Sequence, residues 1–196
     1  MSQPPIFGPG LSRSVSLRLI ADADHYTVLV QQVIPRAKVS VWIATANVKE
    51  LMVEAPIGST ARARGRYISL LETLQGLADR GVDLRVLHAT DPSRAFRAEL
   101  QRRTSLRRKM QMRQCPRVHL KLVAVDGALL YLGSANFTGA GLGAKGGNRR
   151  NFELGVITDD DVLLDEVQGR FDSIWRGREC GACRCRGVCP KPFEQV

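Results

Sequence analysis

Two nearly continuous apolar segments constrain the fold of this chain most strongly. Val39–Ala46 (VSVWIATA) is rich in β-branched residues, a pattern typical of a strand covered on both faces. Tyr67–Arg80 has the spacing of an amphipathic helix that ends at Gly81, and Val82–His88 then resembles the first strand. Because buried strands and amphipathic helices alternate, we expect an α/β fold with a mostly buried sheet.

The amino-terminal region is expected to lead into this fold. Residues 1–21 are rich in Pro, Gly and Ser, and we expect a loose lead with one short edge strand over 14–20. An aspartate can then cap a helix over about 22–33, which Pro35 should stop. The folded unit should therefore begin near residue 22.

The second half of the chain predicts a hairpin, a strand and a helix. Val118–Val125 and Ala128–Gly133 are joined by Asp126-Gly127, a strong hairpin signal. Phe152–Thr158 is predicted as a further strand, and a last helix should end near Trp175. The hairpin matters most, because its ends carry polar side chains.

These polar groups suit phosphate chemistry. His119 and Lys121 are two residues apart, so in a strand both side chains point to the same face. Ser134 and Asn136 follow the partner strand and bring a hydroxyl and a carboxamide close to that face. Such donors suit a phosphoryl group, whose transition state spreads negative charge over its equatorial oxygens.

The spacing of these residues resembles a known family signature. Six residues at fixed separations resemble the complete signature of the phospholipase D superfamily: His119, Lys121, Asp126, Gly133, Ser134 and Asn136. Glu153 resembles the acidic residue that follows this signature. The resemblance covers roughly residues 24–178. It implies a three-layer α/β/α sandwich with a mixed, mostly buried sheet, in the single-motif, nuclease-like branch of the superfamily.

The resemblance also implies a role for each catalytic residue. His119 would be the nucleophile and form a covalent phosphohistidine, which divides one difficult displacement into two easier ones. Lys121 and Asn136 would hold the phosphate oxygens, and Ser134 would support them or the histidine. Glu153 would accept a hydrogen bond from the other imidazole nitrogen and so fix the tautomer.

The remaining expectations concern the metal and the assembly. Asp126 lies at the turn and is expected to be structural, orienting the hairpin or a neighbouring charge. No metal is needed for catalysis, because Lys121 and a second imidazole would stabilise the charge. His25 and His88 complete no second motif in this chain. The resemblance therefore implies a homodimer whose twofold axis places both His119 side chains at one shared site.

Charge distribution helps to choose the substrate. The chain has 29 Lys and Arg against 19 Asp and Glu, and Ser93–Arg117 holds nine of these basic residues and one acid. This Arg-rich segment leads into the His119 strand through Pro116, so we expect it at the rim of the active site, joined by Arg62, Arg64 and Arg66. Such cations favour DNA or RNA as the partner. The candidate nucleic-acid-binding residues are Arg102, Arg103, Arg107, Arg108, Lys109 and Arg113.

Two alternatives stay open. An acidic lipid surface could use the same cations, which would make the protein a phospholipid hydrolase of phospholipase D or cardiolipin type. Membrane docking also needs exposed large apolar groups, whereas Phe96, Leu100 and Leu106 are expected to be committed to packing. The other alternative is a catalytically silent member of the fold that only binds nucleic acid.

Four cysteines lie close together near the carboxyl end of the sequence. Four thiolates at this spacing could hold one tetrahedral zinc ion: Cys180, Cys183, Cys185 and Cys189. An iron–sulfur centre and unliganded or disulfide-paired thiols are the alternatives. Cys115 is expected to be a separate buried thiol. The surrounding basic residues, Arg178, Arg184, Arg186 and Lys191, would give a further nucleic-acid contact.

Location and domain organisation follow from what the sequence contains. The first 20 residues show no basic region followed by an apolar run, and no window offers about 18 uninterrupted apolar residues, so we expect no membrane span and a cytoplasmic location. The expected division is a flexible lead over 1–21, a phospholipase D-like catalytic domain over 22–178, and a Cys-rich tail over 179–196.

Overall fold

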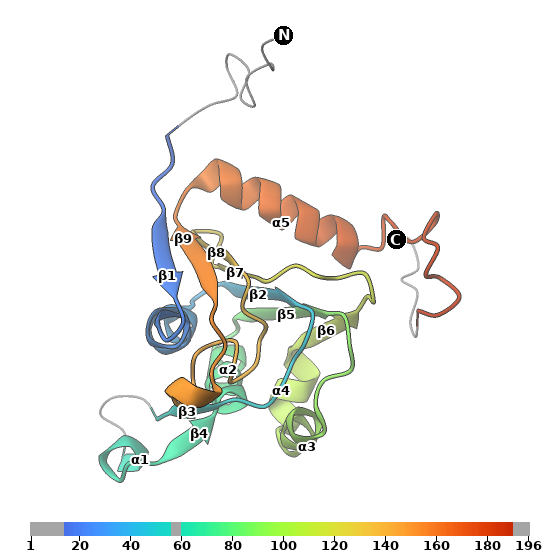
Figure 1. The fold of residues 1–196 in the computed structure, drawn as a ribbon. Helices are drawn as coiled ribbons and strands as arrows, with labels where there is room; N and C mark the ends of the chain where they lie inside the picture. Colours follow the sequence, from blue (N-terminus) through green and yellow to red (C-terminus); the bar gives the residue numbers. More distant parts are fainter. Residues whose placement is uncertain (1–13, 56–59, 190–196) are drawn as a thin grey trace.

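A mixed seven-stranded sheet forms the centre of the molecule (Figure 1). The computed structural model describes residues 14–55 and 60–189. The strand order is β1-β9-β8-β7-β2-β5-β6. The bounds are β1 (Arg18–Ala21), β2 (Ser40–Thr45), β5 (Asp83–His88), β6 (Gln111–Gln114), β7 (Leu122–Val125), β8 (Leu129–Gly133) and β9 (Leu154–Thr158). Strands β2, β5 and β6 are parallel, and the other neighbours in the sheet are antiparallel.

Helices cover both faces of this sheet. They are η1 (His25–Val33), η2 (Ile34–Arg36), α1 (Thr60–Ala63), α2 (Leu70–Asp79), α3 (Arg94–Arg102), α4 (Thr104–Lys109), η3 (Gly147–Arg149) and α5 (Asp161–Trp175). A small ribbon of β3 (Met52–Glu54) and β4 (Tyr67–Ser69) lies outside the main sheet. Figure 1 shows α5 on one side and α2, α3 and α4 on the other.

Two separate sets of apolar contacts hold the layers together. On one face, Leu74 of α2 and Leu106 of α4 pack in the core that contains Ile43 of β2. On the other face, Phe171 of α5 stacks on Trp42 of β2, with ring centroids 5.2 Å apart. The predicted three-layer α/β/α sandwich with a mixed sheet is therefore confirmed.

The β7–β8 hairpin has the predicted turn. Asp126 and Gly127 have φ values of 57° and 62°, the left-handed conformation that a two-residue hairpin turn requires. However, β7 begins at Leu122, so His119 and Lys121 precede the strand instead of lying inside it. The reason is that Ala44, the partner of Leu122, is the last β2 residue that pairs with β7.

Two other predicted elements have different bounds, and one strand of the sheet has no sequence prediction. The helix expected from Tyr67 begins at Leu70, because the Ser69 side chain caps it by accepting the backbone N–H of Leu71 at 3.0 Å. The strand expected from Phe152 begins at Leu154. Strand β6 was not predicted, because Gln-Met-Arg-Gln lacks the apolar pattern of a buried strand and forms the sheet edge.

Some expectations fall partly outside the described residues. Of the expected lead, 1–13 lie outside them, while 18–21 form β1 and pair with β9. Residues 56–59 of the predicted Arg-bearing loop, the Arg62 side chain and residues 190–196 of the tail also lie outside. Within 14–55 and 60–189, no helix has the length and apolar character needed to cross a bilayer.

Asp126 connects the hairpin turn to the start of β2. Its carboxylate accepts the backbone N–H groups of Lys38, Val39 and Ser40 at distances between 2.7 and 3.0 Å. Burial opposes ionisation, but these three donors outweigh it and hold the pKa of Asp126 below its ordinary value. The residue therefore acts on the fold at the end of β7 opposite to His119.

Asp126→Asn is expected to destabilise the fold by about 2 kcal/mol, because an ionised acceptor of several hydrogen bonds is lost. The melting temperature should fall by roughly 4–8 °C. Because folding lowers this pKa, the contribution is complete above about pH 4 and is lost as the pH falls further. Calorimetry of both proteins from pH 7 to pH 3 measures this, and a constant difference at all pH values would contradict it.

Candidate active site

The residues of the signature converge at one edge of the sheet. His119 and Lys121 precede β7, Ser134 and Asn136 follow β8, and Glu153 precedes β9. Because β7, β8 and β9 are antiparallel neighbours, these three chain ends meet on the same side. Five residues from distant parts of the sequence thus surround one small surface.

The Lys121 ammonium group lies against the imidazole of His119. Its Nζ atom is 3.0 Å from Nδ1 and 3.1 Å from Nε2, and it donates to the His119 carbonyl oxygen at 3.0 Å. Burial lowers the pKa of Lys121, whereas the Glu153 carboxylate acts in the opposite direction. The His119 side chain is exposed. A cation beside an accessible imidazole can hold a phosphate oxygen while the unprotonated ring nitrogen attacks phosphorus.

Glu153 interacts electrostatically with Lys121 and is buried, with 8% of its surface exposed. Its carboxylate accepts hydrogen bonds from the Ser134 hydroxyl and, at 3.0 Å, from Nδ2 of Asn151. The resemblance implies a hydrogen bond from His119, but in this arrangement the carboxylate is bonded to Ser134 and Asn151 instead. Ser134 also accepts the backbone N–H of Leu154 at 3.1 Å, so its hydroxyl is fixed beside Glu153.

Asn136 is oriented by the end of β2. Its Oδ1 atom accepts the backbone N–H of Asn47 at 3.2 Å and the hydroxyl of Thr45 at 3.3 Å. This arrangement leaves Nδ2 as a donor for a phosphate oxygen. Thr45 and Asn47 lie far from the motif in sequence, so the motif alone does not identify them. The available signal was a threonine at the end of an otherwise apolar strand.

Asp22 makes two hydrogen bonds with Glu153, and His25 contacts Asp22; the sequence signature includes neither residue. Asp22 donates its backbone N–H to the Glu153 carbonyl and accepts the Glu153 N–H through Oδ1, both at 2.9 Å. The fully buried His25 ring has Nδ1 3.1 Å from the Asp22 carbonyl and packs edge-on against Tyr131. Burial lowers the pKa of His25. Gly155 is required here, because a Cβ atom would lie 2.4 Å from the Tyr131 ring.

The cations of α4 lie at the other end of the sheet. Strand β6 follows α4 and runs parallel to β5, and its carboxyl end leads toward His119. Lys109 accordingly pairs at 2.9 Å with Asp79, the last residue of α2, before β5 begins. Arg107 and Arg108 are exposed on the same short helix. The structure therefore separates these three predicted nucleic-acid-binding residues from the signature residues.

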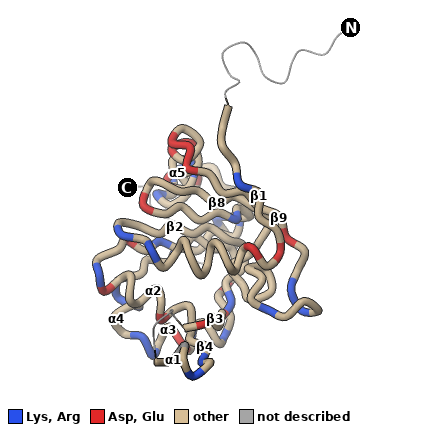
Figure 2. The backbone as a smooth tube through the Cα atoms, turned by 90° about the vertical axis from the view of Figure 1, so that its left-hand side faces the viewer, with Lys and Arg blue, Asp and Glu red and all other residues tan. Residues whose placement is uncertain are grey.

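The other predicted binding residues largely serve the fold. Arg103 forms ion pairs with Glu99 at 2.8 Å and with Glu72 at 3.3 Å. The Arg113 guanidinium lies 4.8 Å from the centre of the Trp175 ring and donates to the Trp175 carbonyl. Arg102, exposed, pairs with Glu99 at 3.4 Å. Figure 2 shows basic residues on α4 and around the α1–β4 region, on several surfaces.

Different cations lie close to the signature residues in the chain and in the fold. The backbone N–H of Lys49 donates to the Phe137 carbonyl at 3.0 Å, which places it one residue from Asn136. Arg149 and Arg150 immediately precede the Asn151–Glu153 segment. Lys49 and Arg149 are exposed and Arg150 is half-buried. We call Lys49, Arg149 and Arg150 the rim cations.

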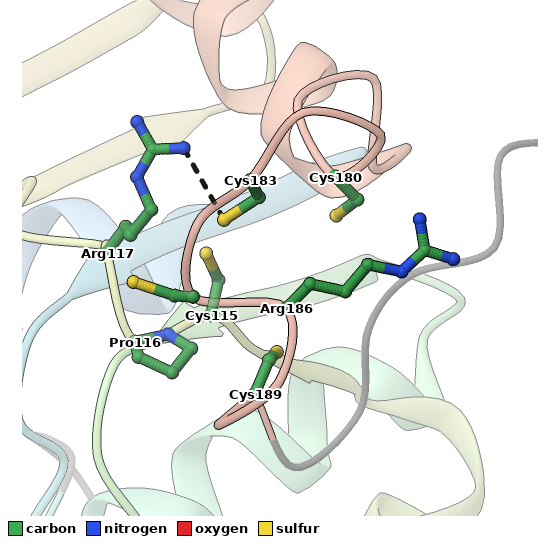
Figure 3. A pocket seen from close by; sticks show the side chains of 8 residues that line it. Cys115, Pro116, Arg117, Cys180, Cys183, Arg186 and Cys189 are labelled. Carbon is green, nitrogen blue, oxygen red and sulfur yellow. Dashed lines mark hydrogen bonds between the residues drawn. The ribbon is translucent and has the colours of Figure 1, made fainter.

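Cys115 shares a small cavity with the tail cysteines, contrary to the expectation of a separate thiol (Figure 3). Arg117 lies 3.7 Å from the Cys183 sulfur. The backbone N–H of Cys185 and this guanidinium lower the pKa of the Cys183 thiol. Within the described residues, no three His, Cys, Asp or Glu side chains are gathered closely enough to hold a metal ion as they stand.

Comparisons with known proteins agree with this architecture. The family model described as "Cardiolipin synthase, PLD-like domain" matches residues 30–175. Nuc from Salmonella typhimurium, a phospholipase D family member, is 19% identical with a TM-score of 0.58, covering 83% of this chain and 95% of its own. NucT from Helicobacter pylori is 15% identical with a TM-score of 0.54, covering 82% of this chain and 95% of its own.

Other solved structures share the fold over part of their length. Phosphatidylserine synthase from Haemophilus influenzae is 12% identical with a TM-score of 0.57, covering 78% of this chain and 35% of its own. The archaeal chromatin protein TrmBL2 is 13% identical with a TM-score of 0.50, covering 87% of this chain and 55% of its own. No curated protein sequence matches the chain significantly.

Proposed function

This chain belongs to the phospholipase D superfamily, and we propose that it is a phosphodiesterase that cleaves DNA or RNA through a phosphohistidine at His119. The observation that carries the proposal is the convergence of an exposed imidazole, an ammonium group and two oriented polar side chains at one sheet edge. Every one of these groups has a use in phosphoryl transfer.

The proposed reaction has two displacements at phosphorus. A ring nitrogen of His119 attacks, a P–N bond forms, and the P–O bond to the leaving group breaks. The Lys121 ammonium and the Asn136 amide bind the non-bridging oxygens as their charge increases. Water then attacks phosphorus and gives its proton to the group that protonated the leaving oxygen, while the P–N bond breaks and the imidazole is restored. Glu153 stabilises the positive charge of this cluster, and Asp22 positions its backbone.

A general acid must protonate the leaving oxygen, and we propose that it is His119 of a second copy. The chain has three histidines. The other two, His25 and His88, are buried, and each places Nδ1 near a backbone carbonyl, at 3.1 and 2.9 Å. A twofold homodimer would supply the second imidazole. Exposed apolar side chains beside Glu153 support this proposal, since Phe152 is 96% and Leu154 is 60% exposed.

Nucleic acid is the proposed substrate because the rim cations can follow a phosphate backbone past the site. The archaeal chromatin protein TrmBL2, which is described as binding DNA, shares this fold. Phospholipid hydrolysis is the second candidate. The observation that favours it is the family model, whose description names cardiolipin synthase.

The remaining proposals concern location, metal and domains. All five cysteines are free thiols, and a reducing cytoplasm would keep them so. We propose that catalysis uses no metal and that the Cys-rich tail binds a structural zinc ion. We also propose that residues 22–178 act as the catalytic domain, together with strand β1 at its edge.

A substrate panel in the presence of a chelator tests this function. Supercoiled DNA, single-stranded DNA, RNA and anionic phospholipid vesicles are each incubated with the protein with and without EDTA. We expect cleavage of at least one nucleic acid at the same rate in both conditions. Release of a headgroup from vesicles, with every nucleic acid left intact, would replace the proposal by the phospholipid alternative.

Two charge-matched double variants test the rim cations in the same panel. Arg149→Ala/Arg150→Ala should weaken nucleic-acid binding and lower the slope of log affinity against log salt by about 2. Arg107→Ala/Arg108→Ala removes the same charge from α4, far from His119, and should change the slope much less. Equal losses in both variants would restore α4 as part of the binding surface.

A further inference from the structure

Five thiols from two distant segments line one cavity (Figure 3). Cys115 directly follows β6, and the others lie in the tail after α5. The four tail cysteines are half-buried, whereas the residues between them, 181–182, 184 and 186–188, are all exposed. The tail therefore turns its sulfur atoms inward, toward the segment that carries Cys115.

The described part of the tail, residues 176–189, has no regular secondary structure and no disulfide bond. Residues 176–189 of the described chain form turns and no helix or strand, with hydrogen bonds such as Cys189 N–H to the Cys185 carbonyl at 2.8 Å. Residues 180–189 include no buried side chain, and the thiols form no disulfides. A short segment without an apolar core usually requires a metal or a disulfide to hold its shape.

The cavity suits a single soft cation. It has a volume of about 20 Å³, and its described lining consists of the five cysteines with Pro116, Arg117 and Arg186. That volume accommodates roughly one water-sized particle. Thiolates without carboxylates select zinc over magnesium or calcium, and zinc takes four of them.

Three tail cysteines lie around the same space as Cys115. In Figure 3 the side chains of Cys115, Cys180, Cys183 and Cys189 enter this cavity from different sides. Cys185 contributes differently, because its backbone N–H donates to the Cys183 sulfur. An N–H group that supports a ligand sulfur is typical of the surroundings of a metal site.

We propose that Cys115, Cys180, Cys183 and Cys189 bind one zinc ion that fastens the tail to the turn preceding His119. This inference rests on the proposed structural zinc and changes its ligands, since Cys115 replaces Cys185. The backbone N–H of Val118 donates to the Cys115 carbonyl at 2.9 Å, so the ligand belongs to the turn that ends at the nucleophile. Zinc binding requires the four sulfur atoms to move closer together, to about 2.3 Å from the ion.

Single substitutions distinguish this ligand set from one confined to the tail. The full chain is purified under reducing conditions, loaded with zinc and measured by elemental analysis and chelator competition. We expect one zinc per chain, a decrease in affinity of at least about 100-fold for Cys115→Ser, and a change of less than about threefold for Cys185→Ser. Circular dichroism verifies that both variants are folded.

Cobalt provides a second readout that does not depend on the variants. Cobalt-loaded wild type should show tetrahedral thiolate absorption, and Cys115→Ser should lose intensity while Cys185→Ser retains it. Loss of zinc in Cys185→Ser with retention in Cys115→Ser would overturn the ligand assignment and leave the zinc proposal standing. A wild-type chain that binds neither zinc nor cobalt would overturn both, without affecting the proposed phosphodiesterase reaction.

Discussion

His119→Ala is expected to lower the rate of phosphodiester cleavage by at least about 10,000-fold, because removing a nucleophile removes the covalent route. The imidazole is exposed and makes side-chain contact with Lys121, so its loss should leave the fold intact. The measurement is single-turnover cleavage of the best substrate from the panel, with nucleic-acid affinity and melting temperature as controls. Residual activity above about one hundredth would contradict a nucleophilic role.

Mixed dimers test whether the site is shared. If wild-type and His119→Ala chains are co-expressed equally and pair at random, only wild-type pairs are active when both histidines are needed. Specific activity should then fall to about a quarter of the wild-type value. A fall to about one half would indicate that each subunit works alone, and light scattering that finds a monomer would contradict the dimer directly.

Lys121→Met is expected to lower kcat by at least about 100-fold, because an ammonium group aimed at the transferring phosphoryl group is lost while the length of the side chain is kept. The effect should fall mainly on kcat, since the rim cations still bind the polymer. A rise in KM with kcat unchanged would show that Lys121 only helps to bind substrate.

The pH dependence provides the matched control for Lys121. Burial lowers the pKa of Lys121. As the pH rises, the ammonium group should therefore lose its proton before the pH reaches the ordinary lysine pKa of about 10.4. Activity should therefore decline as the pH rises toward this value. Lys121→Arg, which stays charged, should retain part of the activity and lose this decline. An alkaline limb that is identical in both proteins would assign it to another group.

The grouping of the signature residues at one sheet edge could be predicted because it depends on local spacing. His119 and Lys121 immediately precede β7, and Ser134 and Asn136 follow its hairpin partner, so a two-residue turn at Asp126 is enough to bring them together. The alternation of apolar strands and helices likewise predicted the layers, since burial on both faces leaves a clear pattern in sequence.

The supporting residues could not be predicted because their roles depend on long-range pairing. Asp22 reaches Glu153 only because β1 pairs with β9 across the whole chain. The Arg-rich segment was expected beside His119, but β6 separates α4 from it. This edge strand has polar residues and gave no apolar signal in the sequence. Cys115 joins the tail thiols for the same reason, since β6 ends beside the end of α5.

The most direct test of the central claim is to trap the covalent intermediate. Substrate carrying a ³²P label at the scissile phosphate is mixed with excess protein and denatured in alkali within the first turnover, since phosphohistidine survives alkali. The proposal predicts label on the protein, released by acid, mapped to His119 and missing in His119→Ala. Rapid cleavage of the same substrate with no label on the protein at any time would contradict a phosphohistidine mechanism.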